Sequence, residues 1–232
     1  MVPAALEHPQ IATRVAAQRF AEPLPQPAGT DPPALPDWWP GNEDPLVYLT
    51  FGSVAAGAHL PYFPALYRAA IDALATLPVR VLLTIGDDRD HAELGRLPAN
   101  VHVERWVAHD VVASHASVVV GHGGYGTTLG TLRRGVPLVV VPLFSADQWA
   151  NAAAVAAAGA GLALDAERAT RRVLGLPSVR TLAAIGPAVA RVLEDPSYRQ
   201  AAQRIAAAMR ALAPVDDAPG VLRGLAARPA AV

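Results

Sequence analysis

The sequence contains no cysteine, and all nineteen of its basic residues are arginines, so lysine is missing as well. The lack of cysteine excludes disulfides, thiolate zinc sites, iron–sulfur clusters and cysteine nucleophiles. The lack of lysine excludes a Walker A phosphate loop and a Schiff-base enzyme. The net charge of −1 provides no electrostatic footprint for nucleic acid or an anionic membrane surface.

Long hydrophobic runs are also missing. No apolar stretch approaches the roughly 18 residues of a membrane span, and residues 1–10 lack the basic and apolar regions of a secretory signal. We therefore expect a soluble cytoplasmic protein without a membrane partner. Apolar residues make up 52% and charged residues 17%, which is enough to build a core. Since aromatics are only 6%, that core must consist of Ala, Val and Leu.

Proline divides the chain into unequal parts. Residues 1–44 hold nine prolines and predict an extended arm or linker, with one short helix around Ala12–Arg19. Residues 45–213 are expected to form one domain, because regular patterns begin there. Residues 214–232 are expected to be a weakly ordered tail.

Short apolar runs alternate with helical patterns through this domain. This alternation predicts an α/β fold with a doubly wound parallel sheet of Rossmann type. The expected strands are Leu46–Phe51, Val79–Ile85, Val101–Glu104, Ser117–Val120, Leu138–Val141 and Gly161–Leu164. The expected helices are Tyr62–Ala75, Asp110–His115, Thr127–Arg134, Gln148–Ala158, Ser178–Leu193 and Tyr198–Leu212.

Ligands of such sheets bind beyond the carboxyl ends of the strands, and the most unusual segment of the chain lies there. Residues 121–128 read Gly-His-Gly-Gly-Tyr-Gly-Thr-Thr and connect a strand to a helix. Glycines allow close backbone approach, and a helix N-terminus favours anions, so the segment predicts a phosphate site. A tight turn with a Thr cap is the simpler alternative. A nicotinamide or flavin site is another, because Gly121, Gly123 and Gly126 match the dinucleotide fingerprint and Asp147 lies about twenty residues on.

The loop before the helix at Gln148–Ala158 is the second polar segment. Asp147, Gln148 and Asn151 together suit the hydroxyl groups of a sugar, although Asp147 could instead be an N-cap. Asp88-Arg89-Asp90 resembles a metal–diphosphate motif, but a solvated turn is the preferred interpretation. The histidines other than His122 show no metal-ligand spacing and are interpreted as surface or capping residues, and no metal is expected.

Several ordered motifs resemble the C-terminal domain of family 1 nucleotide-sugar glycosyltransferases, and most closely the bacterial enzymes that glycosylate macrolides and other polyketides, of the erythromycin biosynthesis type. The resemblance covers about residues 14–212. The motifs that carry it are residues 122–128, Gly135-Val136-Pro137, Pro142, Asp147-Gln148, Asn151-Ala152 and Gly159-Ala160-Gly161, with Leu35–Trp39 and Leu46–Ser53 resembling the interdomain linker and first strand.

The resemblance implies the C-terminal half of a GT-B fold, in which this domain binds a UDP- or TDP-sugar. The implied activity is inverting, metal-independent transfer of a hexose to a hydroxyl of a small natural product, with no cofactor. By position, the implied diphosphate contacts are His122, Gly123, Gly124, Gly126, Thr127 and Ser53. Trp106 and Val107 would contact the base, and Asp147 and Gln148 the sugar.

Two positions depart from the family pattern, and one half of the enzyme is not expected in this chain. His109 stands where Trp-x-Pro-Gln has its Gln, and Gly130 stands where many relatives place a ribose-binding Glu. Because only residues 1–44 precede the first strand, we expect the acceptor domain and the catalytic base to be missing. The alternative is a non-catalytic nucleotide-sugar binding module that needs a separate acceptor-domain chain. A nicotinamide-dependent oxidoreductase is a second and more remote alternative function.

Overall fold

The computed structural model describes residues 20–21, 43–52, 61–87, 90–165 and 176–226. Six parallel strands form the central sheet, in the order β4-β3-β2-β5-β6-β7. Their bounds are β2 Leu46–Thr50, β3 Arg80–Thr84, β4 Val101–Glu104, β5 Val118–Gly121, β6 Leu138–Val140 and β7 Gly161–Ala163. The expected doubly wound parallel sheet is confirmed, and each predicted strand lies within two residues of an observed one.

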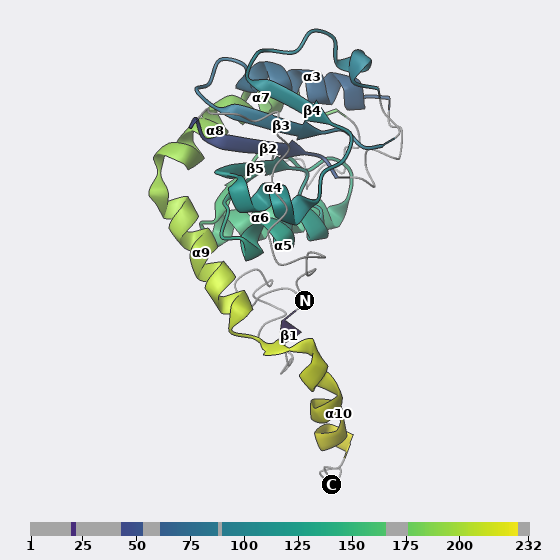
Figure 1. Cartoon of the computed structure of the whole chain (residues 1–232), viewed down its shortest axis with the longest axis vertical. Coiled ribbons are helices and arrows are strands. Elements are labelled where there is room, and N and C mark those ends of the chain that lie inside the picture. The colour runs from purple at the N-terminus through teal and green to yellow at the C-terminus, as the bar shows by residue number, and fades with distance from the viewer. Residues whose placement is uncertain (1–19, 22–42, 53–60, 88–89, 166–175, 227–232) are drawn as a thin grey trace.

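Helices cover both faces of the sheet (Figure 1). One face packs against α3 (Phe63–Leu74), α7 (Val179–Ala183) and α8 (Ile185–Glu194). The opposite face packs against α4 (His109–His115), α5 (Tyr125–Arg133) and α6 (Ala146–Ala157), and α9 (Pro196–Arg210) lies against α5. A 3₁₀ helix, η2, spans His91–Leu94. Burial on both faces explains why the central strands are largely continuous apolar runs, whereas β4, at one edge of the sheet, alternates buried and half-buried residues.

The strand register aligns the carboxyl ends of the central strands. Thr50 at the end of β2 pairs with Thr84 of β3 and with Gly121 of β5, and Gly121 pairs with Val140 of β6. The order reverses between β2 and β5, because the chain leaves β2 toward α3 on one face and leaves β5 toward α5 on the other. Such a reversal opens a crevice between the two outgoing loops.

The helix predicted over Ser178–Leu193 is wrong as one continuous element. The structure divides it at Ala184 into α7 and α8. Pro187 accounts for the break, because proline lacks an N–H and its ring clashes with the carbonyl four residues earlier. Proline is tolerated in the first turn of a helix, and Pro187 is the third residue of α8.

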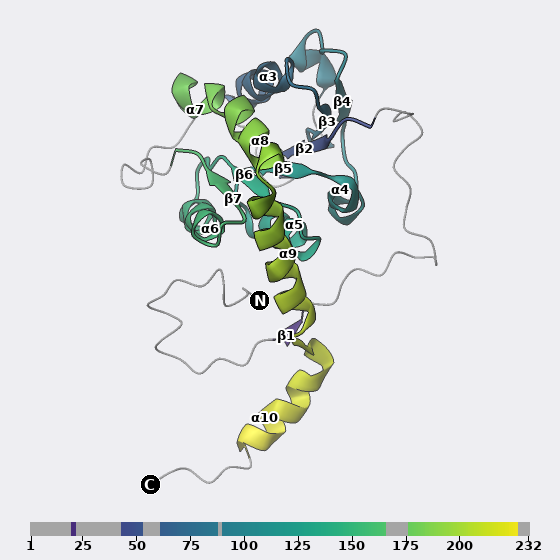
Figure 2. The same cartoon turned by 90° about the vertical axis from the view of Figure 1, so that its left-hand side faces the viewer.

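A second, two-stranded sheet joins the first described segment to the segment that follows α9. Strand β1 (Phe20–Ala21) pairs in parallel with β8 (Ala213–Pro214). The 3₁₀ helix η4 (Val215–Asp217) and helix α10 (Ala218–Ala226) follow, and α10 extends away from the sheet (Figure 2). A helix therefore forms within the range expected to be a weakly ordered tail. The helix predicted around Ala12–Arg19 lies outside the described residues, and the domain boundaries themselves stay a prediction. Among the described helices, none has the length and apolarity to cross a bilayer.

Helix α8 crosses α3 at Gly186, and this contact yields a stability prediction. A Cβ added to Gly186 would overlap the Ala73 carbonyl oxygen. Gly186→Ala should therefore lower the free energy of unfolding by about 1–3 kcal/mol in urea titrations, although alanine is the better helix former. Gly220→Ala in α10 is the matched control, because nothing lies within 4 Å of its added Cβ. Equal stability of the two variants would contradict the close contact.

Candidate functional site

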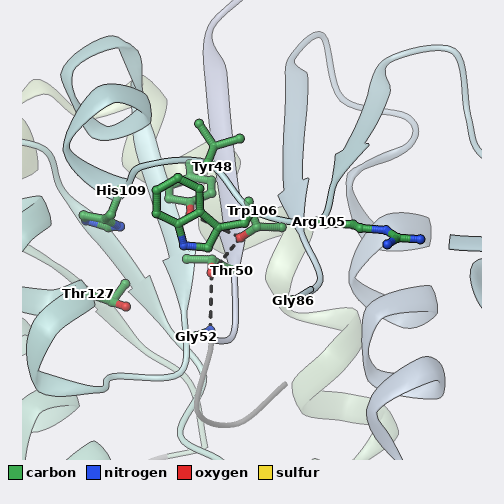
Figure 3. A pocket seen from close by; sticks show the side chains of 10 residues that line it. Tyr48, Thr50, Gly52, Gly86, Arg105, Trp106, His109 and Thr127 are labelled. Atoms are coloured by element: carbon green, nitrogen blue, oxygen red, sulfur yellow. Dashed lines mark hydrogen bonds between the residues drawn. The ribbon is translucent and has the colours of Figure 1, made fainter. Parts of the chain in front are cut away.

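A pocket of about 200 Å³ opens at the carboxyl ends of β2 and β3, beside the reversal in strand order (Figure 3). Strands supply its floor, the loop between β4 and α4 supplies one wall, and the start of α5 supplies another. The lining residues are Tyr48, Thr50, Gly52, Thr84, Gly86, Arg105, Trp106, Val107, His109 and Thr127. The sequence-based prediction placed Trp106, Val107 and Thr127 in one site, and the structure brings these three together.

The glycine loop between β5 and α5 lies next to this pocket and depends on glycine at two positions. Gly123 has φ +85°, and a Cβ there would lie 2.8 Å from the Gln148 carbonyl oxygen. Gly52, after β2, has φ +81°, and its added Cβ would lie 2.6 Å from Cε1 of His122. The His122 ring also lies against Gly124, where an added Cβ would overlap Nε2. The ring therefore fills the space between the two loops.

His122 is a neutral imidazole at physiological pH. Its exposed fraction is 9%, and this burial lowers its pKa to about 4, against a smaller raising effect of the Asp147 carboxylate. Its buried Nδ1 has no hydrogen-bond partner within the described structure. A buried polar atom without a partner is unfavourable, so Nδ1 is available to a ligand.

The N-terminus of α5 adds a positive electrostatic end beside His122. Gly124 is its N-cap residue, and no side chain caps the helix. The first intrahelical bond recorded there runs from the Thr128 N–H to the Gly124 carbonyl, at 2.9 Å. The N–H groups of Gly126 and Thr127 precede it and have no acceptor within the helix. A helix of nine residues with this start, next to the unpaired Nδ1, suits an anion such as a phosphate.

Two side-chain amides at the start of α6 hold the loop before this helix and the glycine loop in place. Gln148 has an exposed fraction of 3%, and its Oε1 accepts hydrogen bonds from the backbone N–H of Leu143 at 2.8 Å and of Phe144 at 3.1 Å. Asn151 Nδ2 donates to the Gly123 carbonyl at 2.8 Å. The side-chain oxygen Oε1 of Gln148 thus holds the loop before α6, and the predicted sugar contact of this residue stays a prediction.

Asp147 points to solvent, unlike its neighbour Gln148. Ser145 is the N-cap residue of α6, and its hydroxyl bonds to Asp147 Oδ1. The alternative of Asp147 as N-cap is therefore wrong, because the helix begins at Ala146 and Asp147 is its second residue. Its carboxylate acts on the pKa of His122, which places it near the phosphate-type end of the site. Because it follows β6 by seven residues, it does not end that strand as the acidic residue of a dinucleotide site would.

Trp106 lines the pocket from the loop between β4 and α4. It follows β4 in the chain, and it is 62% exposed. The indole lines the same pocket as Tyr48 and Thr50 (Figure 3), and its exposure leaves it accessible to a stacking partner. Val107 is half-buried and packs against the apolar cluster beneath α4. Ser53 lies outside the described residues, as do Asp88 and Arg89. Asp90 caps η2 by accepting from the Ala92 N–H at 2.9 Å.

His109 lines the pocket, and its interpretation as a surface or capping residue was wrong. The Thr131 hydroxyl donates to the Thr127 carbonyl at 2.7 Å, so it must accept from His109 Nε2 at 3.2 Å. His109 therefore carries its proton on Nε2 and leaves Nδ1 as an acceptor. Burial lowers its pKa, which keeps this form neutral. A Cβ at Gly130 would lie 2.9 Å from His109 Cδ2, so the two departures from the family pattern are in contact.

Comparisons with known proteins show the family and the fold of this chain. A family model described as erythromycin biosynthesis protein CIII-like, C-terminal domain, matches residues 68–216. The chain is similar to 4'-demethylrebeccamycin synthase of Lentzea aerocolonigenes, with 36% identity over 212 residues, which are 89% of this chain and 45% of that protein. It is also similar to the elloramycin glycosyltransferase ElmGT of Streptomyces olivaceus, with 38% identity over 173 residues, 71% of this chain and 39% of that protein.

Solved structures show the same fold. The glycosyltransferase SnogD of Streptomyces nogalater aligns with a TM-score of 0.73 and 27% identity, over 97% of this chain and 56% of that one. The glycosyltransferase VinC in complex with dTDP aligns with a TM-score of 0.65 and 26% identity, over 85% of this chain and 46% of that one. The sheet matches the C-terminal, Rossmann-like half of a GT-B fold. The chain spans a little under half the length of the curated relatives it matches.

The buried, neutral His122 makes stability depend on pH. Between pH 6.5 and about 4 the unfolded chain protonates this imidazole and the folded chain does not. The contribution is complete above pH 6.5 and is lost as pH falls toward 4, at up to about 1.4 kcal/mol per pH unit. When the pH is lowered from 7.5 to 5, the free energy of unfolding should fall in both proteins. The fall should be smaller in His122→Gln than in the wild type, by about 2 kcal/mol. Urea titrations at both pH values test this. An equal fall in the two proteins would contradict the lowered pKa of His122.

Proposed function

Since the chain belongs to the family of erythromycin biosynthesis protein CIII-like C-terminal domains, we propose that it is the donor-binding half of a natural-product glycosyltransferase. Its ligand in this proposal is a UDP- or TDP-sugar, whose hexose is transferred to a hydroxyl of a small-molecule acceptor. The observation that carries the proposal is the unpaired, buried Nδ1 of His122 beside the uncapped N-terminus of α5, whose third residue, Thr127, lines the same pocket as Trp106. One end suits a diphosphate and the other an aromatic base.

The diphosphate is the leaving group in this proposal. The acceptor oxygen forms a bond to the anomeric carbon from the face opposite the diphosphate, and the carbon–oxygen bond to the diphosphate breaks with its electron pair. That displacement inverts the anomeric centre. His122, the N–H groups of the glycine loop and the Thr127 hydroxyl stabilise the growing negative charge as fixed dipoles. Because these dipoles stabilise the charge of the diphosphate, the proposed reaction includes no metal ion and no cofactor.

The remaining contacts follow from the two ends of the pocket. Trp106 stacks on the pyrimidine, and Val107 contacts it beside the ring. Asp147, exposed near His122, accepts hydrogen bonds from sugar hydroxyls, and we assign Gln148 to the sugar through its amide nitrogen, because its oxygen is bound to the loop. Ser53 follows Gly52 and is assigned to the diphosphate by position.

The acceptor and the general base that deprotonates its hydroxyl belong to a further domain in this proposal. That domain is either another part of the same enzyme or a separate acceptor-domain chain. In the second case the present chain is a nucleotide-sugar binding subunit without activity of its own. Activity assays of the chain alone and with an acceptor-domain chain of a relative separate these two cases.

A thermal-shift titration with UDP, TDP, UDP-glucose and TDP-glucose tests the binding proposal. A ligand at about 100 times its dissociation constant adds about 2.7 kcal/mol of stability. For a chain of this size, the unfolding midpoint should rise by roughly 5–11 °C. The preferred nucleotide identifies the base.

The same titration with NAD is the control for the oxidoreductase alternative. A shift with NAD and none with UDP or TDP species would overturn the proposal. No shift with any of these ligands would contradict a preformed donor site in this chain.

The sugar end can be separated from the nucleotide end by two substitutions. Asp147→Ala should weaken binding of the UDP- or TDP-sugar more than binding of the free diphosphate, because Asp147 contacts only the sugar. His122→Ala should weaken both ligands, by about tenfold or more, because it removes a donor to the diphosphate.

Calorimetric titration of each variant with both ligands measures the effect, and Asp217→Ala, an exposed carboxylate in η4, serves as the control. If Asp147→Ala weakened the free diphosphate as much as the nucleotide sugar, the assignment of the loop before α6 would be wrong.

A further inference from the structure

The imidazole ring of His109 is held by three neighbours where it lines the pocket. Its Nε2 lies 3.2 Å from Thr131 Oγ1, and a Cβ added at Gly130 would lie 2.9 Å from its Cδ2. The ring of Tyr48 lies beside it, with the two ring centroids 5.5 Å apart. The edge of the imidazole that carries Cδ2 and Nε2 therefore faces α5, and Nδ1, on the other side of the ring, faces away from that helix.

The hydroxyl of Thr131 determines which ring nitrogen carries the proton. Thr131 is fully buried, and its Oγ1 donates its one hydrogen to the Thr127 carbonyl oxygen at 2.7 Å. Oγ1 can therefore only accept from His109 Nε2, and the other nitrogen of a neutral imidazole is then an acceptor. Burial lowers the pKa of His109, against a smaller raising effect of Asp110 and with a smaller lowering effect of Arg134, so the ring stays neutral.

Nδ1 of His109 is an acceptor that the protein itself does not use. Within the described residues, the ring makes one hydrogen bond, that of Nε2. Nδ1 does not belong to the fully buried polar atoms that lack a partner, so it is accessible. The hydroxyls of Tyr48, Thr50 and Thr84, which line the same pocket, are bonded to one another. His109 therefore offers the pocket an acceptor that is fixed in place and not engaged elsewhere.

The position of His109 indicates which part of a nucleotide meets this acceptor. It follows Trp106 by three residues, and the Thr131 hydroxyl connects it to Thr127. His109, Trp106 and Thr127 all line the pocket (Figure 3). In the proposed function Trp106 stacks on the base and Thr127 contacts the diphosphate, and the part of a nucleotide that connects base and diphosphate is the pentose. The hydroxyls of a pentose can donate to Nδ1.

The pocket also lacks the usual acceptor for a pentose. In Rossmann folds that bind dinucleotides, the carboxylate of an Asp or a Glu accepts from the ribose. None of the described residues that line this pocket carries a carboxylate. A neutral imidazole nitrogen accepts one hydrogen bond, whereas a carboxylate with its two oxygens can accept from two neighbouring hydroxyls.

We propose that His109 is a specificity-determining residue whose Nδ1 accepts a hydrogen bond from a pentose hydroxyl of the bound nucleotide, and that Thr131 is a positioning residue that keeps the ring proton on Nε2. The inference rests on the proposed nucleotide-sugar function. Its consequence is that one of the two hydroxyls of a ribose contributes to binding through His109 and the other does not. The site therefore selects a nucleotide by its pentose as well as by its base.

The first test compares UDP with its 2'-deoxy and 3'-deoxy forms in calorimetric titrations. Loss of the recognised hydroxyl should lower the affinity of the wild type about threefold to tenfold, and loss of the other should change it by less than about twofold. His109→Phe keeps a ring beside Tyr48 and removes the acceptor, so its affinities for the three ligands should agree within about twofold. If the chain prefers TDP, TDP and its 3'-deoxy form provide the same comparison.

The matched control for this substitution is His115→Phe. His115 is an exposed residue at the end of the same helix, α4, and it does not line the pocket. This variant should keep the preference of the wild type among the three ligands. If His109→Phe does not fold in a thermal melt, His109→Ala replaces it in the same titrations.

The second test measures the position of the ring proton. In nitrogen-15 NMR spectra of the wild type, Nε2 of His109 should give the signal of a protonated nitrogen and Nδ1 that of an unprotonated one. Thr131→Val keeps the shape of the side chain and removes the acceptor of the Nε2 proton. The two signals should then move toward each other, because both tautomers become populated, and the preference among the three ligands should become smaller.

The matched control for Thr131 is Thr181→Val. Thr181 is also a buried threonine with a side-chain partner, Ser178 Oγ at 2.8 Å, but it lies in α7 and does not line the pocket. Its replacement should change neither the two nitrogen signals of His109 nor the preference among the ligands.

The outcomes separate this inference from the proposed function. A wild-type chain that binds neither UDP nor TDP overturns the proposed function. A wild-type chain that binds, and whose affinity changes by less than about twofold on loss of either pentose hydroxyl, overturns only the inference. A His109→Phe variant that keeps the preference of the wild type also overturns it, as does a wild type with the proton on Nδ1. Unchanged nitrogen signals in Thr131→Val would contradict the positioning role of Thr131.

Discussion

The contact of the His122 ring with the backbones of Gly52 and Gly124 is the constraint on which the site depends. It joins the turn after β2 to the loop after β5, and these two loops border the crevice where the strand order reverses. No residue with a Cβ fits against the ring at Gly52 or Gly124 without a shift, and Gly123 is fixed in the same way by the Gln148 carbonyl. The same packing desolvates the imidazole and leaves Nδ1 without a partner. The packing of the His122 ring therefore determines both the geometry of the two loops and the neutral, unpaired state of the imidazole.

Oriented dipoles, and not a cluster of charged side chains, supply the positive electrostatic potential of the candidate site. The chain has no lysine, and among the residues that line the pocket Arg105 is the cationic side chain, while His122 and His109 have lowered pKa values. Helix α5 and the glycine backbone are the alternative sources of positive potential. Because these dipoles are short-range and partly buried, salt screens them less than it screens surface charges.

Most of the sheet could be predicted from the sequence, because most of its strands are largely apolar runs that end in glycine, proline or a polar turn, and β4, which alternates, is the exception. The glycine loop could be predicted for the same local reason, since Gly121–Gly126 directly follows such a run. The break between α7 and α8 was missed although its signal, Pro187, stands in the sequence. The apolar pattern typical of a helix continues on both sides of Pro187, and this pattern favoured one continuous helix.

The rest of the site depends on contacts between distant segments, which no local pattern encodes. His109 looks like any helix-capping histidine until Thr131 and Gly130 are placed beside it. Thr50 and Thr84 are ordinary strand residues in the sequence, and only the register of β2 with β3 joins their hydroxyls. Asp147 and Gln148 are adjacent in the chain, yet helix geometry turns one outward and buries the other.

The two-residue ladder between β1 and β8 has a consequence for how the chain opens and closes. It joins residues about 190 positions apart, from Phe20 to Ala213, so its formation closes almost the longest loop that the chain allows. Contacts of such long sequence separation form late in folding, and a ladder this short adds little to hold them. Strands β1 and β8 therefore belong to the least protected part of the described backbone in hydrogen exchange, and their ladder can open while the six-stranded sheet stays intact. Opening of this ladder leaves the pocket in place, because none of the residues that line the pocket belongs to β1 or β8.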